Sequence, residues 1–364
     1  MLLHIIAGAR PNFMKIAPII EAIEKAKATG KEISYRLIHT GQHYDKKMSG
    51  DFFEQLGIPA PHVNLEAGGG SQAEQTAAIM VRFEKELQDN PSDLVVVVGD
   101  VTSTMACAIT AQKMGIRVAH VEAGIRSGDW GMPEEINRLV TDSITNYFFT
   151  TSEIANANLL QSGVAANRIF FVGNTMIDTL LKQKSKFIAP AFWKELALQE
   201  KKYLVMTLHR PSNVDHADQL KKLLAVLEKG SEQLPVIFPV HPRTRNNLEQ
   251  FGIQLNHVKM VEPLGYLEFN YLVQHAKGVI TDSGGITEET TVMGVPCMTL
   301  RNSTERPETC TIGTNELLGS DPKALEEALH KLFSNQWKAG GIPPLWDGHA
   351  AERIVASLLE IYAV

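Results

Sequence analysis

The chain has 364 residues, of which 44% are hydrophobic and 21% are charged, and its formal net charge is -6. Because a domain usually has about 100 to 200 residues, this length favours two domains. The composition is typical of a globular protein and excludes a disordered, fibrous or membrane-embedded chain. Charges of both signs are spread without long runs, so we expect neither nucleic acid nor a membrane surface as a partner.

The three cysteines, Cys107, Cys297 and Cys310, are odd in number and lack metal-ligand spacing, which favours a reducing compartment. The apolar residues 1–7 are too few for a signal sequence, and no stretch reaches the roughly 20 apolar residues that cross a bilayer. We therefore expect a cytoplasmic protein without disulfides.

Short apolar runs alternate with longer amphipathic stretches, which predicts an α/β fold with parallel strands joined by helices. In a first doubly wound domain, residues 1–170, we expect strands at 2–7, 33–39, 94–98, 118–121 and 147–150 and helices beginning near residues 11, 48, 71, 102, 132 and 152. After a strand at 169–172 and a linking helix at 175–186, a second domain of the same class, residues 171–349, has expected strands at 203–208, 236–240, 258–261, 278–281 and 296–300. Residues 350–364 are expected to form a terminal helix, for which packing across the domain junction is one option.

Polar residues at the ends of the expected strands form the candidate site, because open parallel sheets bind ligands at the carboxyl ends of their strands. The first strand is followed by Arg10 and then Lys15, where two cations and the helix amides can face an anion. A plain turn with a proline in the first helical turn explains the same residues equally well. No GxGxxG motif occurs, which argues against binding of a nicotinamide cofactor.

Carboxylates follow two further strands of the first half. Asp100 ends the run VVVVGD, Glu122 ends VAHVE, and Glu134 lies at the start of the next helix beside Glu135. Taken singly, Asp100 fits a helix N-cap, and Glu134 fits a first-turn interaction with the helix dipole. Glu122 precedes Ala-Gly and has no such capping role, so the set indicates acid-base chemistry.

The second half places basic and small residues at its strand ends. His209 stands beside Arg210 and Asn213, whereas His241 is interpreted as structural. The stretch TDSGGITEE predicts a strand, a tight turn and a helix whose amides at Ser283, Gly284 and Gly285 suit a diphosphate. Glu289, one and a half turns into that helix, suits a ribose diol, and Arg306 follows a later strand. A purely structural Ser-Gly-Gly turn remains an alternative.

Ten segments of the chain together resemble the non-hydrolysing UDP-N-acetylglucosamine 2-epimerase family, from about residue 1 to residue 350. They are, in order, GARPNFMK, GQHYD, VVVVGDVTST, HVEAGIRSGD, MPEEINR, VGNTMIDTL, LHRPSN, VHPRTR, TDSGGITEE and STERPE. The resemblance implies a GT-B fold, two Rossmann-like domains facing a central cleft, with UDP on the carboxyl-terminal domain and the sugar facing the amino-terminal one.

The resemblance also implies roles for individual residues and the absence of a cofactor. Asp100, Glu122, Glu134 and His209 match catalytic positions, and the substrate-binding positions fall on Arg10, Lys15, Phe269, Ser283, Gly284, Gly285, Glu289 and Arg306. Gln42 and His43 match a segment that binds a second UDP-sugar as activator. The family further implies a homodimer, and the chemistry of the reaction requires neither a metal nor a redox cofactor.

The sequence leaves the sugar and the reaction type open. The family glutamine near the uracil falls on Leu264, and the segments GQHYDKKMSGDFFEQLGIP and HPRTR also resemble epimerases of UDP-2,3-diacetamido-2,3-dideoxyglucuronate. A hydrolysing 2-epimerase is a further alternative. In a different class, a GT-B glycosyltransferase would need an acceptor surface, and a nucleotide-sugar sensor would not need the carboxylates.

Overall fold

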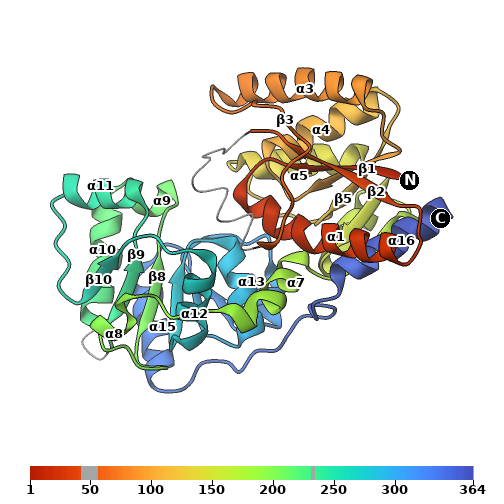
Figure 1. Cartoon of the computed structure of the whole chain (residues 1–364). Helices are drawn as coiled ribbons and strands as arrows, with labels where there is room; N and C mark the ends of the chain where they lie inside the picture. The colour runs from red at the N-terminus through yellow and green to blue at the C-terminus, as the bar shows by residue number, and fades with distance from the viewer. Residues whose placement is uncertain (42–55, 231–233, 364) are drawn as a thin grey trace. The chain divides into compact units, whose positions relative to one another are not determined.

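The computed structural model of the protein describes residues 1–41, 56–230 and 234–363, and for Arg10 it describes only the backbone. By its contacts the chain divides into two compact units: unit 1 comprises Met1–Lys182 and Pro344–Val364, and unit 2 comprises Gln183–Pro343. Each unit is built around one parallel β-sheet with helices packed on it (Figure 1). The predicted α/β class is confirmed.

Unit 1 contains a seven-stranded sheet with the strand order β3-β2-β1-β4-β5-β6-β7. Its elements are β1 (Leu2–Ala7), α1 (Arg10–Ala28), β2 (Ser34–His39), β3 (Val63–Asn64), α3 (Gln72–Asp89), β4 (Leu94–Val98), α4 (Thr102–Lys113), β5 (Arg117–Val121), α5 (Pro133–Ile144), β6 (Tyr147–Thr150), α6 (Glu153–Gln161), a 3-10 turn (Ala166–Arg168), β7 (Ile169–Phe171), α7 (Thr175–Gln183) and α16 (Ala350–Tyr362).

Unit 2 contains a six-stranded sheet with the strand order β10-β9-β8-β11-β12-β13. Its elements are a 3-10 turn (Lys184–Lys186), α8 (Phe192–Glu195), β8 (Leu204–Thr207), α9 (Pro211–Val214), α10 (Ala217–Gly230), β9 (Val236–Pro239), α11 (Pro242–Gln250), β10 (Val258–Val261), α12 (Tyr266–His275), β11 (Gly278–Thr281), α13 (Gly284–Met293), β12 (Cys297–Thr299), α14 (Pro307–Thr311), β13 (Asn315–Leu317) and α15 (Pro322–Phe333).

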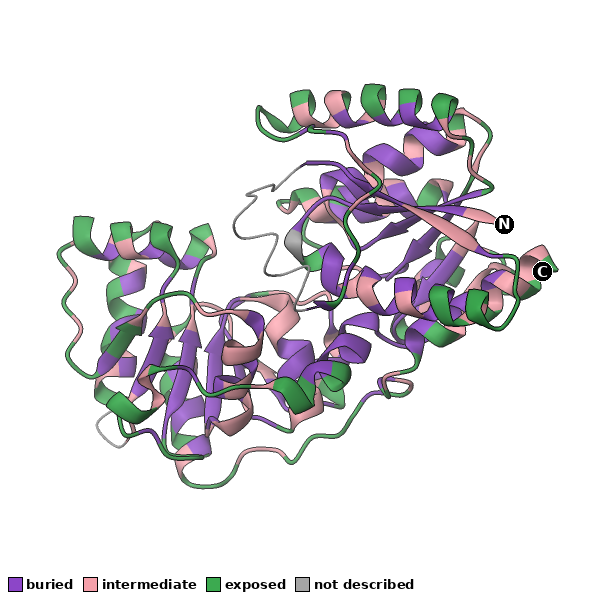
Figure 2. Ribbon diagram, viewed as in Figure 1, coloured by how far each residue is buried: buried purple, intermediate pink, exposed green. Residues whose placement is uncertain are grey.

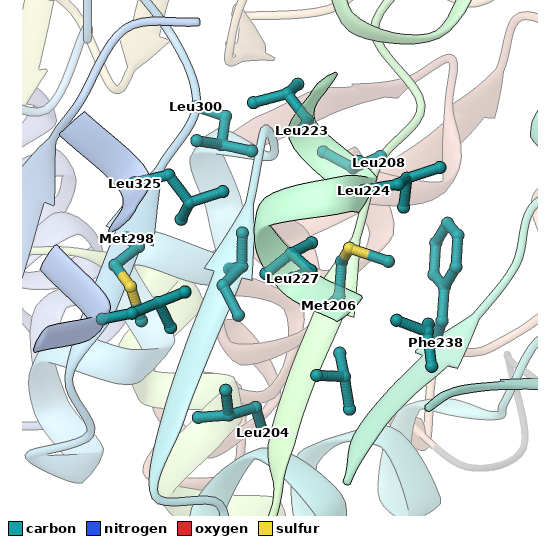
Figure 3. Close-up of a cluster of buried hydrophobic side chains, with 14 of the residues drawn as sticks. Leu204, Met206, Leu208, Leu223, Leu224, Leu227, Phe238, Met298, Leu300 and Leu325 are labelled. Atoms are coloured by element: carbon teal, nitrogen blue, oxygen red, sulfur yellow. The ribbon is translucent and has the colours of Figure 1, made fainter. Parts of the chain in front are cut away.

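The central strands are buried on both faces, which explains their uninterrupted apolar sequences. All five residues of β4 are buried, and four of them are valine, whose branched side chain suits a strand. Helices show the complementary pattern, with buried faces toward the sheet and exposed faces outward (Figure 2). In unit 2, leucines of α10 pack on Leu204, Met206 and Phe238 of the sheet (Figure 3).

The end of the described chain belongs to unit 1. Helix α16 contacts α1 (Figure 1), and the buried carboxylate of Asp178 in α7 accepts hydrogen bonds from the first two amides of α16, Ala350 and Ala351, at 3.1 and 2.7 Å. Thr179 of α7 donates to the carbonyl of Met14 in α1. These bonds hold α7 within unit 1, so the contact boundary after residue 182 differs from the boundary expected after residue 170.

The expected strands of both units are present with ends shifted by at most one residue, and the terminal helix expected at residues 350–364 extends over Ala350–Tyr362. Two edge strands, β3 and β13, were not predicted, because runs of two or three residues give no readable alternation. The helix expected near residue 48 lies outside the described residues. Among the helices that are described, none combines the length and apolar character needed to cross a membrane.

We predict that Gly173→Ala destabilises unit 1 far more than Gly163→Ala. Both glycines have left-handed backbones, with φ of 95° and 86°, but an added Cβ at Gly173 would lie 2.0 Å from the carbonyl oxygen of Leu345, whereas Gly163 has nothing within 4 Å. Backbone strain alone costs about 1 kcal/mol, and the overlap at Gly173 adds about 1 to 3 kcal/mol. Urea unfolding followed by fluorescence measures both losses, and equal losses would contradict the prediction.

Candidate active site

In each unit, polar segments follow the two strands at which the strand order reverses. In unit 1 these strands are β1 and β4, followed by residues 8–15 and 99–102; in unit 2 they are β8 and β11, followed by residues 209–213 and 282–285. Open α/β sheets bind ligands at such reversal points, because the loops leave in opposite directions there. The two predicted groups of site residues therefore fall on the ligand-binding edges of their sheets.

Glu122 follows β5 directly and pairs with Lys15 of α1. Its backbone is left-handed, with φ of 69°, and the residue is only 4% exposed. The carboxylate oxygen Oε2 lies 2.5 Å from Lys15 Nζ. A non-glycine residue in this conformation costs about 1 to 3 kcal/mol, and such strain is concentrated at functional sites. An added Cβ at Gly99 would lie 3.1 Å from Lys15 Nζ, so the end of β4 is next to this ion pair.

Asp100 pairs with Arg138 of α5. Its Oδ2 accepts from Arg138 Nε at 3.1 Å and from Nη2 at 2.7 Å, and its carbonyl accepts from Asn137 at 2.8 Å. The N-cap of α4 is Val101, so Asp100 does not cap this helix. Its carboxylate binds Arg138 instead. Arg138 was not predicted, although it lies one helical turn from Glu134 in the segment MPEEINR, the spacing at which side chains share a helix face.

The two glutamates at the start of α5 differ in their surroundings. Glu135 is 2% exposed and accepts from the amides of Ser127 and Gly128, from the Ser127 hydroxyl and from Arg138. Burial by itself raises the pKa of Glu135, but these hydrogen bonds outweigh it, so the net pKa lies below the usual value. Glu134 is half-buried, and within the described part of the chain its carboxylate makes no hydrogen bond. Glu135 therefore holds the loop 127–128, and Glu134 is available to a ligand.

In unit 2, Asp282 organises the loop that contains His209. Asp282 is fully buried and accepts from the amides of His209 and Arg210, from Asn213 Nδ2, and from His209 Nδ1 at 2.7 Å. Burial raises its pKa, but the bonds from His209, Arg210 and Asn213 outweigh burial and leave the pKa below the usual value. The side chain of His209 is 50% exposed. Asp282 thus fixes one ring nitrogen of a histidine whose other edge reaches solvent.

The start of α13 has the shape of an anion site, but the amide of Ser283 is already hydrogen-bonded, which was not expected. The amide of Ser283 donates to Thr281 Oγ1 at 3.0 Å. The amides of Gly284 and Gly285, the first two residues of the helix, make no hydrogen bond within the described residues. An added Cβ at Gly284 would lie 2.5 Å from Glu305 Oε1. A side chain there would displace the carboxylate of Glu305, which pairs with Arg301.

Glu289 and Arg306 lie in a buried group of charges behind that turn. Burial raises the pKa of Glu289 to about 7, and the side chains of Tyr266 and Asn270 contact its carboxylate. Arg306 is 5% exposed and pairs with Glu288. Phe269 of α12 is partly buried on the adjacent apolar cluster, as is Leu264.

Comparison with known proteins shows which family has this arrangement. The family model described as UDP-N-acetylglucosamine 2-epimerase matches residues 25–359. The chain is 41% identical to the UDP-N-acetylglucosamine 2-epimerase of Methanocaldococcus jannaschii, over 98% of this chain and 99% of that one. It belongs to the UDP-N-acetylglucosamine 2-epimerase family.

Two further proteins of this epimerase family are similar to the chain over nearly its whole length. The crystal structure of the M. jannaschii UDP-GlcNAc 2-epimerase in complex with UDP-GlcNAc and UDP matches with a TM-score of 0.87 at 40% identity, covering 99% of this chain and 100% of that one. The UDP-2,3-diacetamido-2,3-dideoxy-D-glucuronate 2-epimerase of Pseudomonas aeruginosa is 38% identical over 97% of this chain and 98% of its own length. The two parallel sheets therefore form a GT-B-like fold, as the resemblance implied.

The structure does not describe some of the residues that the epimerase family leads us to expect at the site. Gln42 and His43 are outside the described residues, as is the side chain of Arg10. Within residues 1–41, 56–230 and 234–363, no three His, Cys, Asp or Glu side chains gather as they would around a metal ion. The structure brings Lys15, Asp100, Glu122 and Glu134 to one edge of unit 1 and His209, Ser283, Gly284, Gly285 and Glu289 to one edge of unit 2.

We predict that Glu289→Gln changes the pH dependence of stability. The folded-state pKa of about 7 lies above the usual value of 4.5, so the carboxyl group stabilises the fold fully below pH 4.5 and loses this contribution as the pH rises to about 7. Relative to the parent, the variant should gain up to about 3 kcal/mol between pH 4.5 and 8. Denaturant unfolding at several pH values measures the difference, and a constant difference would contradict the raised pKa.

Proposed function

We propose that this chain is a non-hydrolysing UDP-N-acetylglucosamine 2-epimerase that inverts carbon 2 to give UDP-N-acetylmannosamine. Near full-length similarity to named epimerases supports the activity. The supporting observation in the structure is that three carboxylates, Asp100, Glu122 and Glu134, are placed on one edge of unit 1 together with Lys15 and Arg138. Acid-base chemistry on both faces of a sugar carbon requires more than one such group.

The chemistry of carbon 2 explains why UDP must leave. Its hydrogen is not next to a carbonyl, so a base alone removes it too slowly. When the bond between carbon 1 and the phosphate oxygen breaks, the electron pair leaves with UDP and carbon 1 becomes an oxocarbenium-like cation. A carboxylate then takes the proton from carbon 2, which gives 2-acetamidoglucal. Protonation on the opposite face and return of UDP to carbon 1 complete the inversion.

Different groups serve these steps in our proposal. Lys15 and Arg10 assist the departing diphosphate, because charge that develops in a transition state is best stabilised by groups already in place. Asp100, Glu122 and Glu134 stabilise the cation and transfer the proton. Their environments differ, since two of them lie beside cations and Glu134 does not. Such differences between neighbouring carboxyl groups allow separate acid and base roles.

We assign UDP to unit 2 and the sugar to unit 1. The amides of Gly284 and Gly285 at the start of α13, together with Ser283, His209 and Arg306, would hold the diphosphate. Glu289 would bind the ribose hydroxyls, and Phe269 of α12 would contact the uracil.

The substrate UDP-2,3-diacetamido-2,3-dideoxyglucuronate is a second candidate, and a specific observation favours it. The P. aeruginosa epimerase of that sugar is 38% identical over nearly the whole chain. Incubation of each UDP-sugar without an acceptor, followed by product analysis, decides between them. Free N-acetylmannosamine would indicate a hydrolysing epimerase, and a lack of turnover with both sugars would favour a glycosyltransferase or a sensor.

The family resemblance also leads us to propose a cytoplasmic homodimer that supplies cell-surface polysaccharide synthesis. Light scattering of the purified protein tests the dimer, and a monomer mass at micromolar concentration would contradict it.

We predict that product formed in heavy water contains deuterium at carbon 2. Elimination and re-addition exchange this hydrogen with solvent in each cycle, and trace 2-acetamidoglucal with UDP should accumulate. Mass spectrometry of UDP-N-acetylmannosamine measures the label, with substrate incubated without protein as the control. Epimerised product without deuterium would show hydride return and would contradict the roles of all three carboxylates.

We predict that Asp100→Asn, Glu122→Gln and Glu134→Gln each lower turnover by about a hundredfold or more. UDP affinity, measured by calorimetry, should persist because these residues lie outside unit 2. Glu135→Gln is the matched comparison at the neighbouring position. It should mainly lower the thermal midpoint, since it weakens the four hydrogen bonds that a buried carboxylate accepts. Near-normal turnover in the three site variants would remove these carboxylates from the mechanism.

A further inference from the structure

His120 is a fully buried histidine of β5 that the family resemblance did not assign. Its Nε2 lies 2.8 Å from the carbonyl oxygen of Gly99, and its Nδ1 lies 2.7 Å from Asp142 Oδ1. The ring therefore joins three segments of unit 1: the end of β4, strand β5 and helix α5.

Both partners of the ring are acceptors. A backbone carbonyl can only accept, so Nε2 must bear a hydrogen. Asp142 Oδ2 accepts from the amide of Gly124 at 3.1 Å and from Arg126 Nη1 at 2.6 Å. Burial raises the pKa of Asp142, but His120 and Arg126 outweigh burial and bring the pKa below the usual value. Asp142 thus orients the ring through Nδ1, while Nε2 donates to the carbonyl of Gly99.

The contacts of His120 with Gly99 and Asp142, called the bridge below, involve the immediate neighbours of two carboxylates of the proposed site. Gly99 and Glu122 both have left-handed backbones, with φ of 70° and 69°, and the amide of Gly99 donates to the carbonyl of Val121. Asp100 follows Gly99 in the chain. On the other side of the bridge, Asp142 lies one helical turn after the residue that pairs with Asp100.

We infer that His120 is a positioning residue that Asp142 orients, and that it fixes the Gly99 carbonyl and thereby the placement of Asp100 and Glu122. The kinetic part of the inference rests on the proposed epimerase activity, whereas its hydrogen-bonding part is independent of any activity. The two ring nitrogens contact two different elements of unit 1, so the ring resists both rotation and displacement.

Nuclear magnetic resonance of nitrogen-15 histidine-labelled protein tests the hydrogen bonds of the ring. We expect the hydrogen on Nε2 of His120, held against the Gly99 carbonyl, to exchange slowly with water, and its signal is assigned by its loss in His120→Gln. Asp142→Asn should speed this exchange, because the ring is then oriented less firmly. His4 is the internal comparison, since it is equally buried but its ring nitrogens make no hydrogen bond within the described residues, so a slowly exchanging ring hydrogen is not expected there. A His120 ring without a hydrogen on Nε2 in the parent protein would overturn the inference.

Steady-state kinetics tests the positioning role. His120→Gln and Asp142→Asn should lower kcat by about 10-fold to 100-fold, because small displacements of reacting groups have effects of this size. The KM and the UDP affinity should change by less than about threefold, which is under 0.7 kcal/mol. His4→Gln, the same substitution at a buried histidine of β1 that bonds neither Gly99 nor Asp142, should leave kcat unchanged. Unchanged kcat in both bridge variants would overturn the inference, whereas an inactive parent protein would contradict the proposed function and leave the ring measurement decisive.

Discussion

Parallel pairing of β1 with β4 and of β8 with β11 is the constraint on which the site depends. In each pair the chain continues to opposite sides of the sheet, so the carboxyl ends of the two strands face open space rather than a crossing loop. In unit 1, Gly8 and Gly99 lie just after β1 and β4. In unit 2, His209 and Asp282 lie just after β8 and β11. The helices that follow point their amino ends at the same edge, so backbone amides and polar side chains gather there without any long loop.

Carboxylates at these edges fall into two groups by their hydrogen bonds. Glu135, Asp142 and Asp282 are almost fully buried, and each accepts from three or more donors of the surrounding backbone and side chains. Such groups fix loop geometry, because removal of one partner leaves a buried charge. Asp100 and Glu122 have fewer donors, and each lies against the charged end of one long side chain, Arg138 or Lys15. In our proposal this second group supplies the carboxylates that act on the sugar.

Sequence reasoning located the strands and placed the candidate site at their ends, because buried parallel strands are uniform apolar runs and ligands bind where the runs end. It selected Asp100 and Glu122 as candidates by this rule. It did not identify His120, since one polar residue in the strand RVAHV gives no sign of the acceptors at Gly99 and Asp142, which come from other elements.

The same limit applies to the partners that fix the predicted residues. The amides of His209 and Arg210 donate to Asp282, which lies more than 70 positions later in the chain. A single sequence without the fold cannot pair them. The edge strands β3 and β13 were missed for a different reason, namely that their two or three residues are set by the neighbouring strand rather than by their own pattern.

The discontinuous composition of unit 1 has a consequence for biosynthesis. Helix α16, which packs on α1 and is capped by Asp178, is translated only after the whole of unit 2. At about 5 to 20 residues per second, translation of unit 2 takes roughly 10 to 30 s. During this interval the sheet of unit 1 exists without the helix that covers α1, and unit 2 has its complete sequence before α16 is made. The half that is made first is thus completed last, and the apolar surface of α1 beneath α16 stays uncovered until the end of synthesis.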